Sequence, residues 1–179
     1  MKNLLFLVLS IILISCSSVT KDEKNIIDAN AQTEKDIEMY TKVWDTFIQD
    51  GDTSVVNEEN FTTDVVIITD QGDIVGIDAT KAYYENYITA FSDRDWKIID
   101  AFGQGDKLIK HWNFKGKHTG EFFGIPATGN YLDLSGTTIV TMKDGKIAKE
   151  HDFFNMKSLL DQINNSSGDI TIDEYQPIN

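Results

Sequence analysis

Helix-like and strand-like patterns alternate in the first half of the chain and then give way to a run of strands. Apolar residues recur three and four positions apart over residues 33–49, which predicts an amphipathic helix, and a second helix is expected from Asp78 to the Ser92-Asp93 pair. β-rich or alternating stretches predict strands over 61–69, 96–102, 107–118, 131–142 and 147–154. Asn155 can cap a final short helix. This order predicts an α+β fold in which a curved, mostly antiparallel sheet packs against the N-terminal helices and encloses a cone-like cavity.

Alternation within the strands assigns side chains to faces. Every second residue from Leu108 to His118 falls on one largely apolar face, and this set consists of Leu108, Lys110, Trp112, Phe114, Gly116 and His118. In the last strand, Asp152 shares a face with Ala148, Glu150 and Phe154, whereas His151 shares the other with Ile147 and Phe153. The pattern leaves open which face of this strand lines the cavity.

The two ends of the chain differ in character from the domain between them. Residues 4–14 form an apolar run after Lys2, too short to cross a membrane comfortably, and the run ends in Leu-Ile-Ser-Cys at Cys16. This resembles a bacterial lipobox and predicts a signal peptide over 1–15, lipidation of Cys16 and anchoring in the cell envelope. Ser17 in place of an aspartate favours the outer membrane. We expect a polar tether over 16–32, one domain over 33–164 and a polar tail over 165–179.

Charge and residue usage exclude several classes of function. The net charge is −13 and Arg94 is the single arginine, so a nucleic-acid partner is not expected. One cysteine and three histidines without metal-ligand spacing predict no metal site. The Asp93-Arg94-Asp95 triplet is interpreted as a solvated turn, because sequence neighbours in a strand cannot all face one point.

A longer segment carries a family resemblance. Residues 116–129 read GKHTGEFFGIPATG, and they are followed by a strand, by DGKI over 144–147 and by EHDFFN over 150–155. The whole stretch from Ile37 to Ile163 resembles the SnoaL-like polyketide cyclase (ester cyclase) family. The resemblance implies the cone-shaped fold of the nuclear-transport-factor-2-like superfamily, a homodimer, and aldol-type chemistry without metal or organic cofactor.

In that family an aspartate near the end of the last strand is the proposed acid/base, which points to Asp152 here. One carboxyl group can remove a proton next to a carbonyl and later return it, if an apolar wall raises its pKa, and a nearby imidazole such as His118 can polarise that carbonyl. The candidate catalytic residues are therefore Asp152 and His118. Expected contacts to a small hydrophobic ligand are Tyr40, Trp44, Trp112, Phe114, Thr138 and His151.

The chain departs from the family at two positions. Members commonly carry Trp where this chain has His151, and Asp where it has Asn155. If the residue that carries the proton in the family corresponds to Asn155, this chain has lost it, because an amide cannot act as a general base. If that residue corresponds to Asp152, the chain retains it. Two functions stay open, a cofactor-free cyclase or isomerase and a non-catalytic module that binds a small ligand or a partner.

Overall fold

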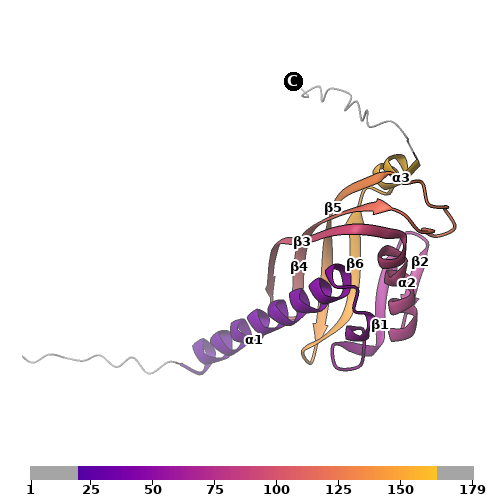
Figure 1. The fold of residues 1–179 in the computed structure, drawn as a ribbon. Helices are drawn as coiled ribbons and strands as arrows, with labels where there is room; N and C mark the ends of the chain where they lie inside the picture. Colours follow the sequence, from indigo (N-terminus) through magenta and orange to yellow (C-terminus); the bar gives the residue numbers. More distant parts are fainter. Residues whose placement is uncertain (1–19, 165–179) are drawn as a thin grey trace, which may run out of the picture.

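The computed structural model describes residues 20–164 and is built on one six-stranded sheet. The strands are β1 (Phe61–Thr69), β2 (Gly72–Val75), β3 (Phe91–Gln104), β4 (Lys107–His118), β5 (Tyr131–Lys143) and β6 (Lys146–Phe154). Their order across the sheet is β2-β1-β6-β5-β4-β3, and every neighbouring pair is antiparallel except β1 with β6. The sheet curves around helices α1 and α2, which confirms the predicted α+β architecture (Figure 1).

Three α-helices pack against the sheet. They are α1 (Lys21–Trp44), α2 (Ile77–Ala90) and α3 (Met156–Asn164), and α1 runs on into a π-helical turn, η1 (Asp45–Gln49), followed by a short 3₁₀ turn, η2 (Thr53–Val55). Asn155 accepts a hydrogen bond from the backbone N–H of Ser158 at 2.9 Å, which confirms its predicted capping of α3.

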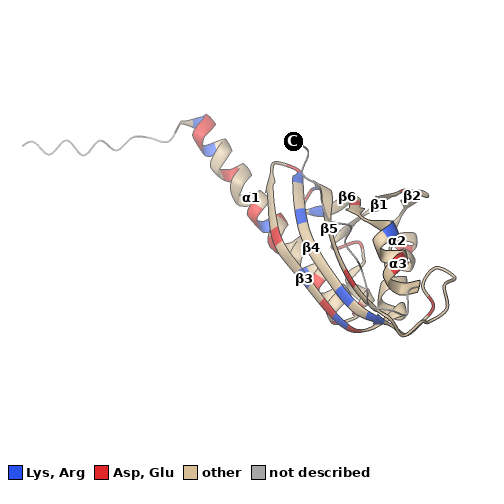
Figure 2. Cartoon of the chain, turned by 90° about the horizontal axis from the view of Figure 1, so that it is seen from above, with Lys and Arg blue, Asp and Glu red and all other residues tan. Residues whose placement is uncertain are grey.

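The predicted start of the first helix at Thr33 is wrong, because α1 begins at Lys21. Thr20 accepts from the backbone of Glu23, and the Glu23 carboxylate accepts from the backbone of Thr20, so a capping box starts the helix twelve residues earlier. Residues 20–32 are exposed throughout, and this half of α1 projects beyond the sheet with acidic and basic residues interspersed along it (Figure 2).

The concave face of the sheet carries the core. In β4 the six even-numbered residues from Leu108 to His118 are all buried, as the alternation predicts, and the apolar face of β5 packs beside them. From the helical layer, Tyr40 and Trp44 of α1, Phe47 of η1 and Tyr84 of α2 fill the cone against this face.

A β-bulge changes the faces of the last strand. Thr141 pairs with Lys149 and Met142 with Ile147, so Ala148 is an extra residue in β6. Ile147 and Glu150 are consequently both fully buried. The prediction that placed Ile147 on the face of His151, opposite Glu150, is therefore wrong, since simple alternation fails across a bulge.

The triplet 93–95 is also not a solvated turn. It lies in β3, which begins at Phe91 rather than near Trp96, and Asp93 adopts a positive φ of 50° within an irregularity of the strand. The Arg94 guanidinium donates to the carbonyls of Ile48, Ile88 and Phe91 at 2.8 to 3.1 Å. Arg94 therefore ties the ends of η1 and α2 to the start of β3.

Predictions for residues 1–15, for Cys16 and for the tail over 165–179 lie outside the described residues. Among residues 20–164, no helix combines the length and the apolar character that crossing a bilayer requires.

Candidate functional site

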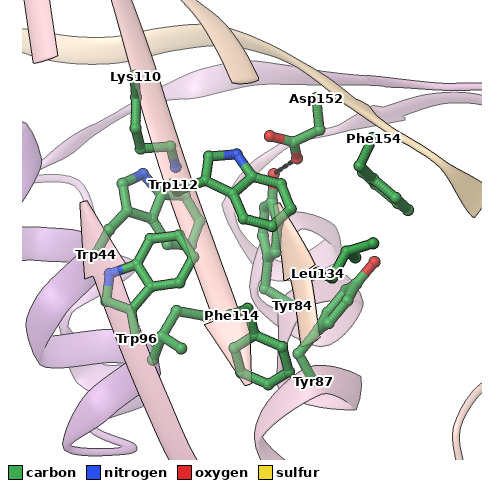
Figure 3. A pocket seen from close by; sticks show the side chains of 11 residues that line it. Trp44, Tyr84, Tyr87, Trp96, Lys110, Trp112, Phe114, Leu134, Asp152 and Phe154 are labelled. Carbon is green, nitrogen blue, oxygen red and sulfur yellow. Dashed lines mark hydrogen bonds between the residues drawn. The ribbon is translucent and has the colours of Figure 1, made fainter. Parts of the chain in front are cut away.

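Two apolar chambers open inside the cone and share part of their walls. The inner chamber has a volume of about 40 Å³, room for very few water molecules, and the outer one has about 290 Å³. Tyr87, Asp152 and Phe154 line both chambers. The remaining walls of the inner chamber are mostly aromatic, as Figure 3 shows, and consist of Trp44, Ile48, Tyr84, Trp96, Lys110, Trp112, Phe114 and Leu134.

Asp152 is the carboxylate at the junction of the two chambers. Its Oδ1 accepts from the Thr138 hydroxyl at 2.5 Å, and its Oδ2 accepts from the Tyr84 hydroxyl at 2.7 Å (Figure 3). Thr138 in turn accepts from the Trp112 indole N–H at 3.0 Å. Two hydroxyl donors from different elements thus fix the orientation of a half-buried carboxylate against aromatic walls.

A second acidic residue, Glu150, lies two positions before Asp152 and is fully buried. Its Oε1 accepts from the Tyr40 hydroxyl at 2.6 Å and from the Trp44 indole N–H at 2.9 Å, both on α1. Burial raises the pKa of Glu150, and the nearby Lys110 ammonium opposes this rise. Burial and the two neighbouring carboxyl groups also hold the pKa of the Tyr84 phenol well above its usual range, so this phenol remains a proton donor.

The Tyr84 hydroxyl connects the two carboxyl groups. It lies 2.7 Å from Oδ2 of Asp152 and 3.1 Å from Oε2 of Glu150. A phenol has one proton and can donate it to one acceptor at a time. Both contacts are hydrogen bonds when Glu150 carries a proton and donates it to the Tyr84 oxygen, while Tyr84 donates to Asp152. The distances fit a carboxylic acid, a phenol and a carboxylate linked in one chain, and the raised pKa of Glu150 favours Glu150 as the acid.

Lys110 is the cation of the inner chamber. It is only 3% exposed, and its ammonium lies over the rings of Tyr40, Trp44 and Trp96 at 4.8 to 5.2 Å from their centroids. Burial lowers the pKa of Lys110, and the carboxyl groups of Glu150, Asp152 and Asp45 oppose this. In Figure 3 its side chain descends towards Trp44 on the far side of the chamber from Asp152.

The Trp112 ring, which lies in the wall between Lys110 and Asp152, approaches Gly136 very closely. A Cβ at Gly136 would lie 2.3 Å from Cζ2 of the Trp112 ring, and the backbone there is not left-handed. We predict that Gly136→Ala displaces this ring, breaks its bond to Thr138 and lowers the free energy of unfolding by about 1–3 kcal/mol. Urea unfolding followed by circular dichroism measures this, with the outward-facing Ser135→Ala as control. Equal stability of the two variants would contradict the assigned contact.

The structure brings together four of the residues predicted for the site. Trp44, Trp112, Phe114 and Asp152 all line the inner chamber. Tyr40 and Thr138 are fully buried behind this wall and orient Glu150 and Asp152 respectively, without lining either chamber themselves.

His118 does not join Asp152. Lys110, Thr138 and Asp152 form one row across β4, β5 and β6, whereas His118 lies eight residues further along β4, about 26 Å of strand. There its Nδ1 is 3.0 Å from the Thr128 hydroxyl, its ring packs against Phe91, and burial lowers its pKa. The expectation that His118 polarises a ligand beside Asp152 does not fit this register.

His151 lies on the convex face of the sheet. It pairs with Ile139 and Ile68, and its ring centroid is 4.0 Å from that of Phe153. Neither chamber includes it, so the expected ligand contact at His151 does not fit the geometry either. The reason is alternation, since Asp152 faces inward and its neighbour must face outward.

Sequence reasoning missed several members of the site. Alternation placed Lys110 on the largely apolar face of its strand and Glu150 on the face of Asp152, with the inward face of that strand left open. Charged residues are rarely buried, so their type gave no reason to choose them. Tyr84 and Tyr87 fall within the predicted second helix, and the hydrogen bonds of Tyr84 to β6 depend on the packing of distant elements. Among residues 20–164, no group of three or more His, Cys, Asp or Glu side chains is placed to hold a metal ion.

Comparison with known proteins agrees with this geometry. The family model described as SnoaL-like polyketide cyclase matches residues 37–163. Among solved structures, a protein from Jannaschia sp. CCS1 assigned as a SnoaL-like polyketide cyclase has a TM-score of 0.69 at 20% identity, covering 75% of this chain and 95% of its own. A protein from Acidithiobacillus ferrooxidans assigned as a polyketide cyclase has a TM-score of 0.65 at 16% identity, covering 74% of this chain and 96% of its own.

An epoxide hydrolase of the LEH-like type from M. tuberculosis shares the fold as well, with a TM-score of 0.57 at 14% identity over 74% of this chain and 91% of its own. No curated protein matches the chain. At these identities the solved structures show the fold alone. The match of the family model, which spans well over half of the sequence, shows that the chain belongs to the SnoaL-like polyketide cyclase family.

Proposed function

We propose that this protein is a lipid-anchored protein of the bacterial cell envelope whose SnoaL-like domain binds a small hydrophobic molecule and transfers a proton to and from it without a cofactor. The observation that carries the catalytic part is the position of Asp152. Its carboxylate is exposed to both chambers, oriented by Thr138 and Tyr84, and surrounded by aromatic walls. A carboxylate in this setting is suited to act as general base and then as general acid.

The mouth of the outer chamber supports a hydrophobic ligand. Phe123 is 49% exposed, and Met156 and Leu160 are each 36% exposed, and all three line this chamber. Large apolar side chains gathered at a concave opening are typical of sites that bind apolar molecules. A ligand that enters here reaches Asp152 first, because Asp152, Tyr87 and Phe154 separate the two chambers.

Exchange of acidic C–H protons tests the proposal without knowledge of the natural substrate. The full-length chain is incubated in D₂O with 2-tetralone, a flat ketone with hydrogens next to its carbonyl, and deuterium uptake is followed by mass spectrometry. We expect faster uptake than in buffer alone. Absence of both exchange and any change in tryptophan emission would overturn the proposal.

A binding module without catalysis is the second candidate, and the small volume of the inner chamber favours it. A ligand confined to the outer chamber would touch Asp152 only at its edge. Binding of 2-tetralone without deuterium uptake is the result expected for this candidate, so the same experiment separates the two.

We further propose a homodimer through the convex face of the sheet. His151, Ile139, Ile109 and Phe102 form one row across four strands on this face. Ile139 is 45% exposed and Phe102 is 54% exposed, so the described chain leaves this largely apolar row uncovered.

We predict that Ile139→Lys converts the dimer to a monomer, because pairing would bury the introduced charge at the centre of the row. Analytical ultracentrifugation of the full-length chain measures the change. Ile27→Lys, at an exposed isoleucine on the projecting half of α1, is the matched control and should leave the dimer intact. A parent protein that sediments as a monomer at micromolar concentration would refute the dimer.

A further inference from the structure

Lys110 is a buried cation whose charge the surrounding protein leaves without an ion pair. Within residues 20–164, its ammonium forms no hydrogen bond or ion pair, and its close neighbours are the faces of Tyr40, Trp44 and Trp96. The faces of aromatic rings attract a cation, but they do not accept conventional hydrogen bonds from its N–H groups as an oxygen atom does. Because Lys110 lines the inner chamber, these donors are available to a molecule inside it.

The nearby acidic groups are already engaged. Both oxygens of Asp152 accept from hydroxyl groups, and Oε1 of Glu150 accepts from Tyr40 and Trp44. Oε2 of Glu150 lies 3.1 Å from the Tyr84 hydroxyl, and Glu150 lines neither chamber. Asp45 accepts from the Trp96 indole N–H at 3.1 Å. The chamber therefore contains one cation at one side and one oriented carboxylate at the other.

The inner chamber between these two groups has a volume of only about 40 Å³, so it takes in one end of a ligand whose remainder lies in the outer chamber. Lys110 and Asp152 belong to one row of the sheet and are separated by Thr138 on β5. Their backbones are thus about 10 Å apart, two interstrand spacings. The Trp112 ring lies between them in Figure 3, and it stacks on the Trp96 ring with an interplanar angle of 30° and a centroid separation of 5.7 Å. Stacked aromatic walls favour a flat framework alongside them.

We propose that Lys110 binds a negatively charged oxygen of the ligand, and that the ligand is a flat apolar molecule bearing an acidic oxygen of the phenol or enol type. This rests on the proposed function of the chamber and adds the polar group that recognises the ligand. Removal of a C–H proton by Asp152 would leave the protonated Asp152, the anionic ligand oxygen and the ammonium of Lys110. The total charge of the chamber is then unchanged, and the negative charge has moved next to the cation.

Ionisation of bound 2-naphthol tests the assignment, since its naphtholate form carries the charge on oxygen and absorbs differently from the neutral form. The probe is titrated with pH while bound to the full-length parent chain and to Lys110→Met. We expect the parent to bind the naphtholate at least tenfold more favourably, relative to the neutral probe, than Lys110→Met does. This equals a difference of about one unit or more in the apparent pKa of the bound probe. Lys97→Met removes an exposed lysine and should match the parent.

Binding is measured separately through tryptophan emission, because all three tryptophans line the inner chamber. If 2-naphthol binds and ionises at the same pH in the parent and in Lys110→Met, the Lys110 assignment is wrong and the pocket function stands. If the parent does not bind the probe at all, the pocket function fails and this assignment fails with it. Should Lys110→Met lose binding, Lys110→Gln, which keeps a polar side chain, provides the same comparison.

Discussion

Asparagine at position 152 is expected to slow deuterium exchange of 2-tetralone by about 10²–10⁴-fold, the usual contribution of a general base. An amide has the shape of the carboxylate but no useful affinity for a proton. Its oxygen can still accept from Thr138, and its NH₂ group can donate to the Tyr84 oxygen, whose own proton then turns to Oε2 of Glu150, so the fold should persist. Mass spectrometry measures the rate, and tryptophan emission measures binding, which should change by less than about threefold.

Asp64→Asn is a suitable control for this substitution, because Asp64 is exposed on β1 and lines neither chamber. It should leave the exchange rate at the parent value. An Asp152→Asn variant that exchanges as fast as the parent would assign the proton transfer to another group, and the proposed role of Asp152 would be wrong. Asn155 is not a substitute, since its side chain caps α3.

Alanine at position 150 is expected to lower the free energy of unfolding by about 3–5 kcal/mol, because it strips partners from buried polar groups. The Tyr40 hydroxyl and the Trp44 indole N–H would both lose their acceptor, and a cavity would remain behind them. Glu150→Gln is the informative comparison. Its amide oxygen can accept from Tyr40 and Trp44 while its NH₂ group donates to Tyr84, as a protonated Glu150 does. Urea unfolding should show a loss below about 1 kcal/mol for this variant.

The pH dependence of these variants follows from the raised pKa of Glu150. Above its ordinary pKa of 4.5 the unfolded chain releases this proton while the folded protein retains it. The unfolded state then binds fewer protons, so the free energy of unfolding falls as pH rises from 4.5 towards the folded-state pKa. Glutamine does not titrate, and Glu150→Gln should lack this part of the decline. If Glu150→Gln shows the same decline with pH as the parent, this part of the pH dependence does not come from Glu150, and its assignment as the protonated member is wrong.

Patterns within single strands predicted the sheet well. The even-numbered residues of 107–118 are buried because a strand packed on one face must alternate, whatever its neighbours are. The same rule failed at Ile147, because the bulge at Ala148 is defined by pairing with β5 and not by the sequence of β6. The start of α1 was missed because a polar, exposed helix has no apolar period, and its capping box at Thr20 and Glu23 was the available signal.

The sequence predicted only part of the candidate site, because contacts between different elements cannot be read from the pattern within one strand. Alternation placed His118 on the largely apolar face of its strand and left open whether Asp152 faces the cavity. Only the register between β4, β5 and β6 shows that the two residues lie at different levels of the cone. Glu150 receives its donors from α1, more than 100 residues earlier, and no local pattern reports such a contact. A lysine or glutamate within an otherwise apolar face was the one sequence signal for this network.

The length of α1 has a mechanical consequence. As a continuous helix of 24 residues it is a rod of about 36 Å. Its free half extends past the sheet, and its other end carries Tyr40 and Trp44, the donors to Glu150. A force on the exposed end of α1, or a tilt of this helix, would therefore move Tyr40 and Trp44 and disturb their hydrogen bonds to Glu150.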